Sequence, residues 1–189
     1  VLQKLTTEEK NKALQTAAND LCERQEEILA ANVLDLENGK NNGMNPGLLD
    51  RLKLTGERIA QIAEGLRQIA ALPDCIGETM EHFERPNGLK IDKVRVPLGV
   101  IGIIYEARPN VTADAFGLCF KTGNAVILKG GSDAIHSNIA IVKVLQDALE
   151  ACSMPRTAVQ LIEDTDRAVT AQFMKMKEYV DVLIPRGGA

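Results

Sequence analysis

The chain has 189 residues, of which 45% are hydrophobic and 25% charged, and a formal net charge of −4. This composition is typical of a packed globular protein with one sizeable core and excludes an intrinsically disordered chain. Lys and Arg are dispersed and aromatic residues make up only 3% of the chain, which argues against nucleic-acid binding. No apolar segment approaches the roughly 20 residues that are needed to span a bilayer.

The four cysteines are far apart, at Cys22, Cys75, Cys119 and Cys152. Their spacing matches neither a zinc site nor a disulfide framework, so no metal is expected. Cys119 lies in an apolar run and is predicted to pack as a small hydrophobic side chain. Reduced cysteines and the lack of a visible signal peptide favour a cytoplasmic location.

Residues 1–75 predict helices that serve packing, with no sign of chemistry. Thr6 and Glu9 have the spacing of a capping box, and Asn45 before Pro46 and Thr55 mark two later helix starts. Apolar residues recur at helical spacing and are expected to face the core. They are Leu14, Ala17, Ala18 and Leu21, then Ile28, Leu29, Val33 and Leu36, and finally Ile59, Ile62, Ala63, Leu66 and Ile69.

Residues 76–96 predict a two-stranded β-ribbon. Pro86-Asn87-Gly88 is a strong turn signal between two polar, extended segments. Because an isolated ribbon is marginally stable in water, it is expected to pair with a later part of the chain or with another subunit.

Residues 97–189 are predicted to form a parallel α/β core, because short apolar runs alternate with segments of helical periodicity. Strands are expected at residues 98–105, 125–128, 159–162 and 180–184. Parallel neighbours need crossover helices between them. The expected fold class is therefore α/β, with a helical N-terminus, a β-ribbon arm and then a doubly wound parallel sheet.

Three crossover helices have predicted caps. Thr112 is the predicted cap of the first helix, which is expected to end before Gly123. Ser132 or Asp133 is expected to cap the second helix and Asp166 the third. The residues of the third helix expected to face inward are Val169, Phe173 and Met176.

Ligands of open parallel sheets bind at the carboxyl ends of the strands, and two of these ends are polar here. Arg108 and Asn110 follow the first strand. An arginine binds carboxylate or phosphate through paired hydrogen bonds, and an asparagine amide can donate to a developing oxyanion. These two residues are therefore candidates for substrate binding. The alternative is structural, with Asn110 as a cap of the next helix.

The second polar end is Lys129-Gly130-Gly131-Ser132, which leads into a predicted helix N-terminus. The free N–H groups and positive dipole of such a terminus favour phosphate. The motif is equally compatible with an ordinary strand-to-helix turn, and the chain contains no G-x-G-x-x-G fingerprint.

Four segments of the chain carry a family signature: residues 96–102, 105–112, 123–131 and 184–189. They resemble the γ-glutamyl phosphate reductase family, within the aldehyde dehydrogenase superfamily. The most specific segment is Tyr105-Glu106-Ala107-Arg108-Pro109-Asn110, since general aldehyde dehydrogenases carry a different loop there. The family resemblance extends through nearly the whole chain.

The resemblance implies an NADPH-dependent enzyme of proline biosynthesis. Such an enzyme reduces L-glutamyl 5-phosphate to L-glutamate 5-semialdehyde and releases phosphate. The resemblance implies substrate contacts for Arg108 and Asn110, and a contact between Lys129 and the adenosine ribose or its 2′-phosphate. The cofactor-binding residues that it implies are Lys129, Gly130, Gly131, Ser132, Arg186, Gly187 and Gly188.

The resemblance covers only about the first half of such an enzyme. The family uses a cysteine nucleophile, and no cysteine here matches its motif. The catalytic domain is therefore expected outside these residues, and the polypeptide alone is expected to be inactive. Residues 1–75 would be the helical part of the cofactor domain and residues 97–189 its NADP-binding core. Residues 76–96 would be an oligomerisation arm, which implies a homo-oligomer.

Three alternatives stay open. The chain could belong to a bifunctional enzyme that also carries glutamate kinase, or to another acylating aldehyde dehydrogenase. It could also be a non-catalytic nucleotide-binding or oligomerisation module. Flanking sequence tests the first alternative, and a substrate screen tests the second. The third predicts that no longer form of the chain exists.

Overall fold

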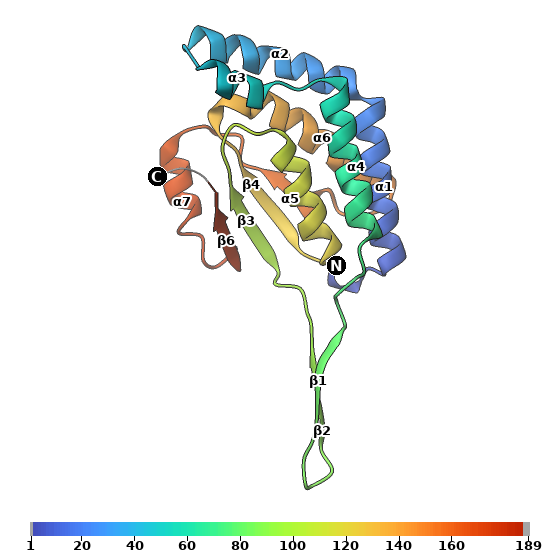
Figure 1. The fold of residues 1–189 in the computed structure, drawn as a ribbon. Helices are drawn as coiled ribbons and strands as arrows, with labels where there is room; N and C mark the ends of the chain where they lie inside the picture. The colour runs from blue at the N-terminus through green and yellow to red at the C-terminus, as the bar shows by residue number, and fades with distance from the viewer. Residues whose placement is uncertain (1, 187–189) are drawn as a thin grey trace.

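A four-stranded parallel sheet organises the computed structural model, which describes residues 2–186 (Figure 1). The helices are α1 (Thr7–Glu23), α2 (Gln25–Asn41), α3 (Pro46–Leu52), α4 (Gly56–Ala71), α5 (Asn110–Lys121), α6 (Ile135–Ala151) and α7 (Arg167–Phe173). The strands are β1 (Thr79–Glu84), β2 (Lys90–Val94), β3 (Val100–Ile104), β4 (Ala125–Lys129), β5 (Val159–Leu161) and β6 (Val182–Pro185).

The sheet order is β5-β4-β3-β6, and all three pairings are parallel. The chain runs outward from β3 to β5 through α5 and α6, then returns to β6 through α7. Because such crossovers are right-handed, the change of direction puts α7 on the opposite face of the sheet. Gly102 of β3 allows this packing, since an added Cβ would lie 2.7 Å from Phe173 Cζ. The predicted doubly wound α/β fold is confirmed.

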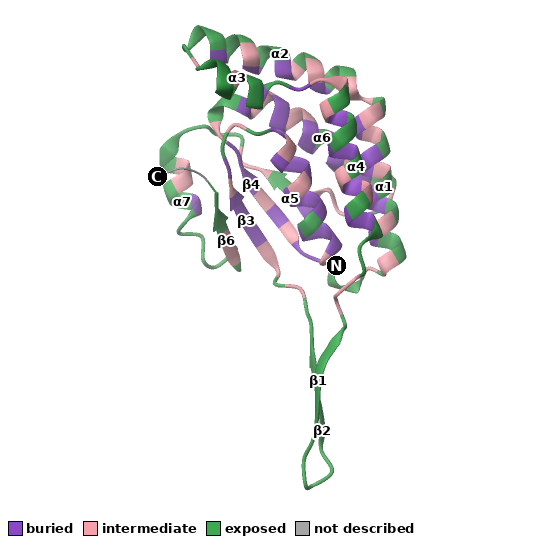
Figure 2. Cartoon of the chain, viewed as in Figure 1, coloured by how far each residue is buried: buried purple, intermediate pink, exposed green. Residues whose placement is uncertain are grey.

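The hydrophobic core lies within three layers (Figure 2). Helices α5 and α6 pack on the sheet, and α1 and α4 form an outer layer over them. The rings of Phe116 and Phe120 stack with centroids 5.3 Å apart. Gly117 brings α5 close to α4, because a Cβ there would lie 2.7 Å from Leu66 Cδ2. Cys119 is buried in this core, as expected. Burial raises the pKa of its thiol to about 11.

Several helix starts follow the local sequence. Thr6 and Glu9 form the predicted capping box of α1. Asn45 and Thr55 accept hydrogen bonds from the first turns of α3 and α4, and Asp166 does so for α7. These caps were predictable because each satisfies an N–H group within a few residues of itself.

Helix α2 buries only part of the face that its apolar residues predict. Ile28 is buried and Leu29 packs against the core, but Val33 is 50% exposed. The other buried residues of this helix are Asn32, Asp35 and Gly39. The Asn32 side chain donates to the Leu52 carbonyl oxygen at 2.9 Å and accepts from the Leu54 N–H at 2.8 Å. Polar bonds to distant segments therefore decide which face of α2 points inward.

Two predicted caps of the parallel core are wrong. Thr112 lies inside α5, which begins at Asn110 after Pro109, and its hydroxyl bonds elsewhere in the core. Ser132 and Asp133 belong to a short 3₁₀ turn, and α6 begins only at Ile135. Met176 is also not inward-facing. It follows the end of α7 and is 42% exposed.

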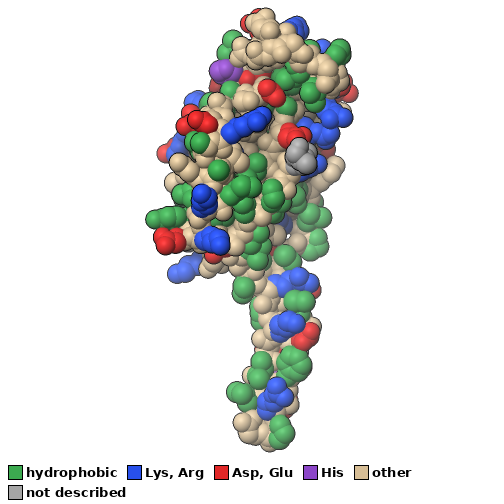
Figure 3. Space-filling model, turned by 90° about the vertical axis from the view of Figure 1, so that its left-hand side faces the viewer, with side chains coloured by type: hydrophobic (Ala, Val, Ile, Leu, Met, Phe, Trp, Pro, Cys, Tyr) green, Lys and Arg blue, Asp and Glu red, His purple; other side chains and the backbone are tan. Residues whose placement is uncertain are grey.

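The predicted β-ribbon is confirmed, with β1 and β2 antiparallel and Phe83 opposite Ile91. All residues of both strands are exposed, and the ribbon projects away from the helices and the sheet (Figures 1 and 2). Hydrophobic and cationic side chains both lie along it (Figure 3). Its pairing with another segment or subunit stays a prediction. Across residues 2–186, no helix has the length and apolar character that crossing a membrane requires.

Candidate functional site

The loop after β3 carries both predicted substrate residues to one edge of the sheet. Tyr105 is buried, and a tight turn follows in which the Arg108 N–H donates to the Glu106 carbonyl oxygen at 2.7 Å. This turn leaves Arg108 exposed and makes Asn110 the first residue of α5.

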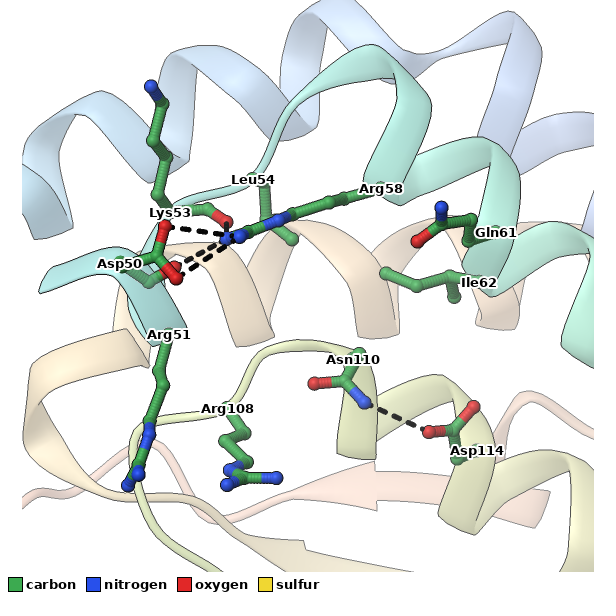
Figure 4. A pocket seen from close by; sticks show the side chains of 10 residues that line it. All are labelled: Asp50, Arg51, Lys53, Leu54, Arg58, Gln61, Ile62, Arg108, Asn110 and Asp114. Atoms are coloured by element: carbon green, nitrogen blue, oxygen red, sulfur yellow. Dashed lines mark hydrogen bonds and ion pairs between the residues drawn. The ribbon is translucent and has the colours of Figure 1, made fainter. Parts of the chain in front are cut away.

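A cavity of about 370 Å³ opens between this loop, α3, α4 and α5. Arg108 and Asn110 both line it, together with side chains of the N-terminal helices (Figure 4). The other lining residues are Asp50, Arg51, Lys53, Leu54, Arg58, Gln61, Ile62 and Asp114. The structure therefore joins the predicted loop to a region that the sequence had marked as packing alone.

A second cavity of about 270 Å³ shares Arg51 and Arg108 with the first. Arg186, which follows β6, lines it as well. Neither Arg51 nor Arg108 takes part in any ion pair found between residues 2 and 186. Guanidinium groups from α3 and the β3–α5 loop are thus both positioned to bind an anion.

Arg58 has a different, structural role. Its guanidinium donates to the Asp50 carboxylate at 3.1 and 3.3 Å, to the Lys53 carbonyl oxygen at 2.7 Å, and to the Asp50 carbonyl oxygen. These bonds connect α4 to the end of α3. The charges of Arg58 and Asp50 therefore offset one another at the cavity wall.

Asn110 and Asp114 lie one turn apart on α5. The Asn110 Nδ2 donates to Asp114 Oδ2 at 3.1 Å, which leaves the second N–H of the amide for another acceptor. Burial raises the pKa of the Asp114 carboxyl, although the bond from Asn110 and the charge of Arg186 act in the opposite direction.

The loop after β4 is much less open. Lys129 is only 4% exposed, and its ammonium donates to the Gly130 carbonyl oxygen at 3.3 Å. Gly130 packs directly on Asn138, because an added Cβ would lie 2.3 Å from its Nδ2. Ser132 is exposed in the 3₁₀ turn that follows.

A buried polar network lies beneath this loop. Thr112 donates to Asn138 Oδ1 at 2.9 Å, so the Tyr105 hydroxyl, 2.7 Å away, donates to Thr112. Burial raises the pKa of Tyr105 to about 12. Among the described residues, Asn138 Nδ2 is the buried side-chain atom without a hydrogen-bond partner. An unpaired buried donor costs roughly 1–3 kcal/mol, so a polar group is favoured at this position.

The predicted free N–H groups at the start of the next helix are not free. Asp35, on α2, accepts from the N–H groups of His136 at 3.1 Å and Ser137 at 2.8 Å. It also accepts from the Ser137 hydroxyl at 2.6 Å. A carboxylate from a distant helix thus occupies the first turn of α6, where the sequence suggested a phosphate.

The third predicted cofactor segment lies only partly in the described structure. The Arg186 N–H donates to the Ile104 carbonyl oxygen at 2.8 Å and extends the pairing of β6 with β3. Gly187 and Gly188 lie outside the described residues.

A nicotinamide cofactor fits the end of β4 in its chemistry. Lys129 is a buried cation that takes part in none of the ion pairs between described residues, and the unpaired Asn138 donor lies beside Gly130. Both features favour an anionic or polar ligand. For a metal ion, residues 2–186 contain no suitable cluster of His, Cys, Asp and Glu side chains.

Arg51, Lys53 and Asp114 line the first cavity but were not predicted from the sequence. A usable signal was the segment Arg51-Leu52-Lys53-Leu54-Thr55, in which two cations alternate with core residues just before a helix cap. Leu52 and Leu54 are buried, so the side chains of Arg51 and Lys53, which alternate with them, point outward.

Residues 1–185 match the protein-family model for the aldehyde dehydrogenase family. The chain belongs to the aldehyde dehydrogenase family. It is 60% identical over 185 residues to the γ-glutamyl phosphate reductase of Heliobacterium modesticaldum and 58% identical to that of Anoxybacillus flavithermus. These alignments cover 98% of this chain but 44% and 45% of the relatives.

A solved structure gives the same result. The γ-glutamyl phosphate reductase of Thermotoga maritima superposes with a TM-score of 0.97 at 44% identity, covering 99% of this chain and 45% of that one. The expected resemblance is therefore confirmed for this member of the aldehyde dehydrogenase family. The chain spans less than half the length of the curated relatives that it matches.

Proposed function

We propose that the chain is the cofactor-binding part of an NADPH-dependent γ-glutamyl phosphate reductase. Such an enzyme converts L-glutamyl 5-phosphate to L-glutamate 5-semialdehyde and phosphate in proline biosynthesis. The observation that carries the proposal is the pair of adjoining cavities that share Arg51 and Arg108, two cations that form no ion pair within residues 2–186. The names of the relatives at 60% and 58% identity support it.

The substrate is rich in negative charge, with an acyl phosphate at one end and a carboxylate at the other. Arg108 binds one of these anions through paired hydrogen bonds in this proposal. Asn110 directs its second amide N–H at the carbonyl oxygen on which charge develops. Both side chains line the same cavity (Figure 4), so one ligand can contact both.

The cofactor is held at the ends of β4 and β6 in this proposal. NADPH, when bound, supplies the hydride of the reaction. Its binding residues are Lys129, Gly130, Gly131, Ser132 and Arg186, with Gly187 and Gly188 beyond the described residues. Lys129 supplies a cation for the 2′-phosphate, which favours NADPH over NADH.

The reaction also needs a thiolate nucleophile. Cys119 is unsuited to this role, because burial raises its pKa to about 11 and keeps it a neutral thiol. We infer that the nucleophile comes from a catalytic domain outside these 189 residues, so that this polypeptide alone does not turn over. We also place the enzyme in the cytoplasm, with the β1–β2 ribbon as the contact of a homo-oligomer and glutamate kinase as a functional partner.

The test is the reverse reaction in a full-length protein that carries this chain. L-Glutamate 5-semialdehyde, NADP⁺ and phosphate should give the acyl phosphate, NADPH and a proton. NADPH formation should require phosphate, and coenzyme A should not replace it. A requirement for coenzyme A would favour another acylating aldehyde dehydrogenase. NADPH binding without turnover on either acceptor would favour a non-catalytic module.

A further inference from the structure

Asp114 is a partly buried carboxylate in the wall of the first cavity, and it has no cationic partner among the residues that the structure describes. Its Oδ2 accepts from the neutral Asn110 amide. None of the ion pairs in residues 2–186 includes Asp114. Asp50, the other carboxylate of this cavity, is already paired with Arg58 at 3.1 Å.

A carboxylate in this setting favours a positive ligand. Partial removal from water destabilises its charged form, which is why its pKa is raised above the ordinary value. The charge of Arg186 lowers the pKa of Asp114, although the two side chains do not form an ion pair. A cationic group from a ligand would compensate the charge at close range, where Asp114 meets the open volume of the cavity (Figure 4).

We propose that Asp114 binds the α-ammonium group of the substrate, so that the cavity selects an acyl phosphate that carries a free α-amine. This inference rests on the proposed function and adds a specificity-determining residue to it. The side chains of Arg51 and Arg108 line the same cavity. A zwitterionic α-amino acid therefore meets an acidic and a basic group, whereas a plain dicarboxylate would meet only the basic groups.

The spacing along α5 agrees with this assignment. Asn110 and Asp114 are four residues apart on one face of the helix, and one helical turn rises about 5.4 Å. In an α-amino acid with a 5-acyl group, four bonds of about 1.5 Å separate the reacting carbon from the amine nitrogen. The Asn110 Nδ2 and the Asp114 Oδ2 lie 3.1 Å apart, so one ligand of this length can bring its carbonyl oxygen to Asn110 and its amine to Asp114.

The experiment compares two substrates that differ only in the amine. In the reverse reaction of a full-length protein that carries this chain, kcat/KM is measured for L-glutamate 5-semialdehyde and for 5-oxopentanoate, which lacks the α-amine. Asp114→Asn keeps an acceptor for Asn110 and removes the charge. Its preference for the amino substrate over 5-oxopentanoate should fall by about 10- to 100-fold relative to the unsubstituted protein.

Asp50→Asn is the matched control, since it removes a carboxylate of the same cavity that is paired with Arg58. It should leave the preference between the two substrates unchanged. Each preference is a ratio measured on one preparation, so partial misfolding and cyclisation of the semialdehyde cancel from the comparison. An unchanged preference in Asp114→Asn would overturn the inference and leave the proposed function intact. Absence of phosphate-dependent turnover in the unsubstituted protein would refute both.

Discussion

The carboxyl ends of β3 and β4 are neighbours, since Ile104 pairs with Lys129, yet their surroundings are opposite. The end of β3 is open, with Arg108 exposed beside two cavities. The end of β4 is closed, with Lys129 and Asn138 buried beneath the loop and Asp35 bonded to the next helix. Polar groups at the open end are available to a ligand, whereas most of those at the closed end hold the fold together.

The largest effect is expected from opening the closed end. Asp35 is 1% exposed and accepts three hydrogen bonds at the start of α6. Asp35→Ala should lower the free energy of unfolding by about 3 kcal/mol, because buried donors lose a charged acceptor. Urea denaturation measures this loss. Asp35→Asn keeps one acceptor oxygen and should cost clearly less, and equal losses for the two variants would contradict the capping role.

At the open end, a substitution should change activity and leave stability intact. Arg108→Ala in a full-length enzyme should lower kcat/KM for the acyl phosphate by about 10- to 100-fold, as expected for a lost charged hydrogen bond of roughly 1.5–3 kcal/mol. The free energy of unfolding should change by less than about 0.5 kcal/mol. Lys12→Ala, which removes an exposed cation of α1, is the control. Unchanged kinetics would return Arg108 to a structural role.

Lys129 tests whether the closed end still serves a ligand. Lys129→Ala should weaken NADPH binding by about tenfold, or about 1.4 kcal/mol, and NADH binding by less, since only NADPH carries a 2′-phosphate. Titration followed by the fluorescence of the reduced cofactor, or calorimetry with each cofactor, measures the two affinities. Equal losses for NADPH and NADH would argue against a contact with the 2′-phosphate.

The smallest effect is expected from acid, and it should arise away from both strand ends. Burial raises the pKa of Asp74, but hydrogen bonds from Lys10, the Ile76 N–H and Thr7 outweigh this and hold it below the ordinary value of 3.8. As the pH falls, the unfolded state therefore binds a proton at this carboxyl before the folded state does. The stability that the ionised carboxylate contributes is fully present above the ordinary pKa and is lost as the pH falls below it.

The melting temperature should accordingly drop by about 2–4 °C through this carboxylate as the pH is lowered below about 4. Asp74→Asn should have a flatter dependence of melting temperature on pH over the same range. If the slope is the same with and without the carboxylate, the acid sensitivity has another source, and the strand-end carboxylates become the next groups to test.

Local signals predicted those parts of the fold in which a residue acts on its near neighbours. The cap at Thr55 and the stripe from Ile59 to Leu66 were predicted correctly, because the hydrogen bond and the helical period both lie within one element. The same reasoning failed for Val33, since polar bonds to other segments orient α2.

The residues of the candidate site also differ in whether a local signal in the sequence could predict them. Arg108 and Asn110 were identified from a polar loop at a strand end, because parallel sheets collect ligands there. Arg51 is 57 positions earlier in the chain and gave no local signal of chemistry. Its place beside Arg108 follows from the packing of α3 near the β3–α5 loop.

The α/β class, the ribbon, most helix starts and the family were predictable from the sequence alone, because periodicity, turn chemistry and motifs are local. Three features follow from the tertiary structure: Asp35 occupies the start of α6, Arg51 and Arg108 share a cavity, and Asp114 faces that cavity without an ion pair among the described residues. Each of these depends on side chains from separate elements, and their meeting is set by long-range packing of helices on the sheet.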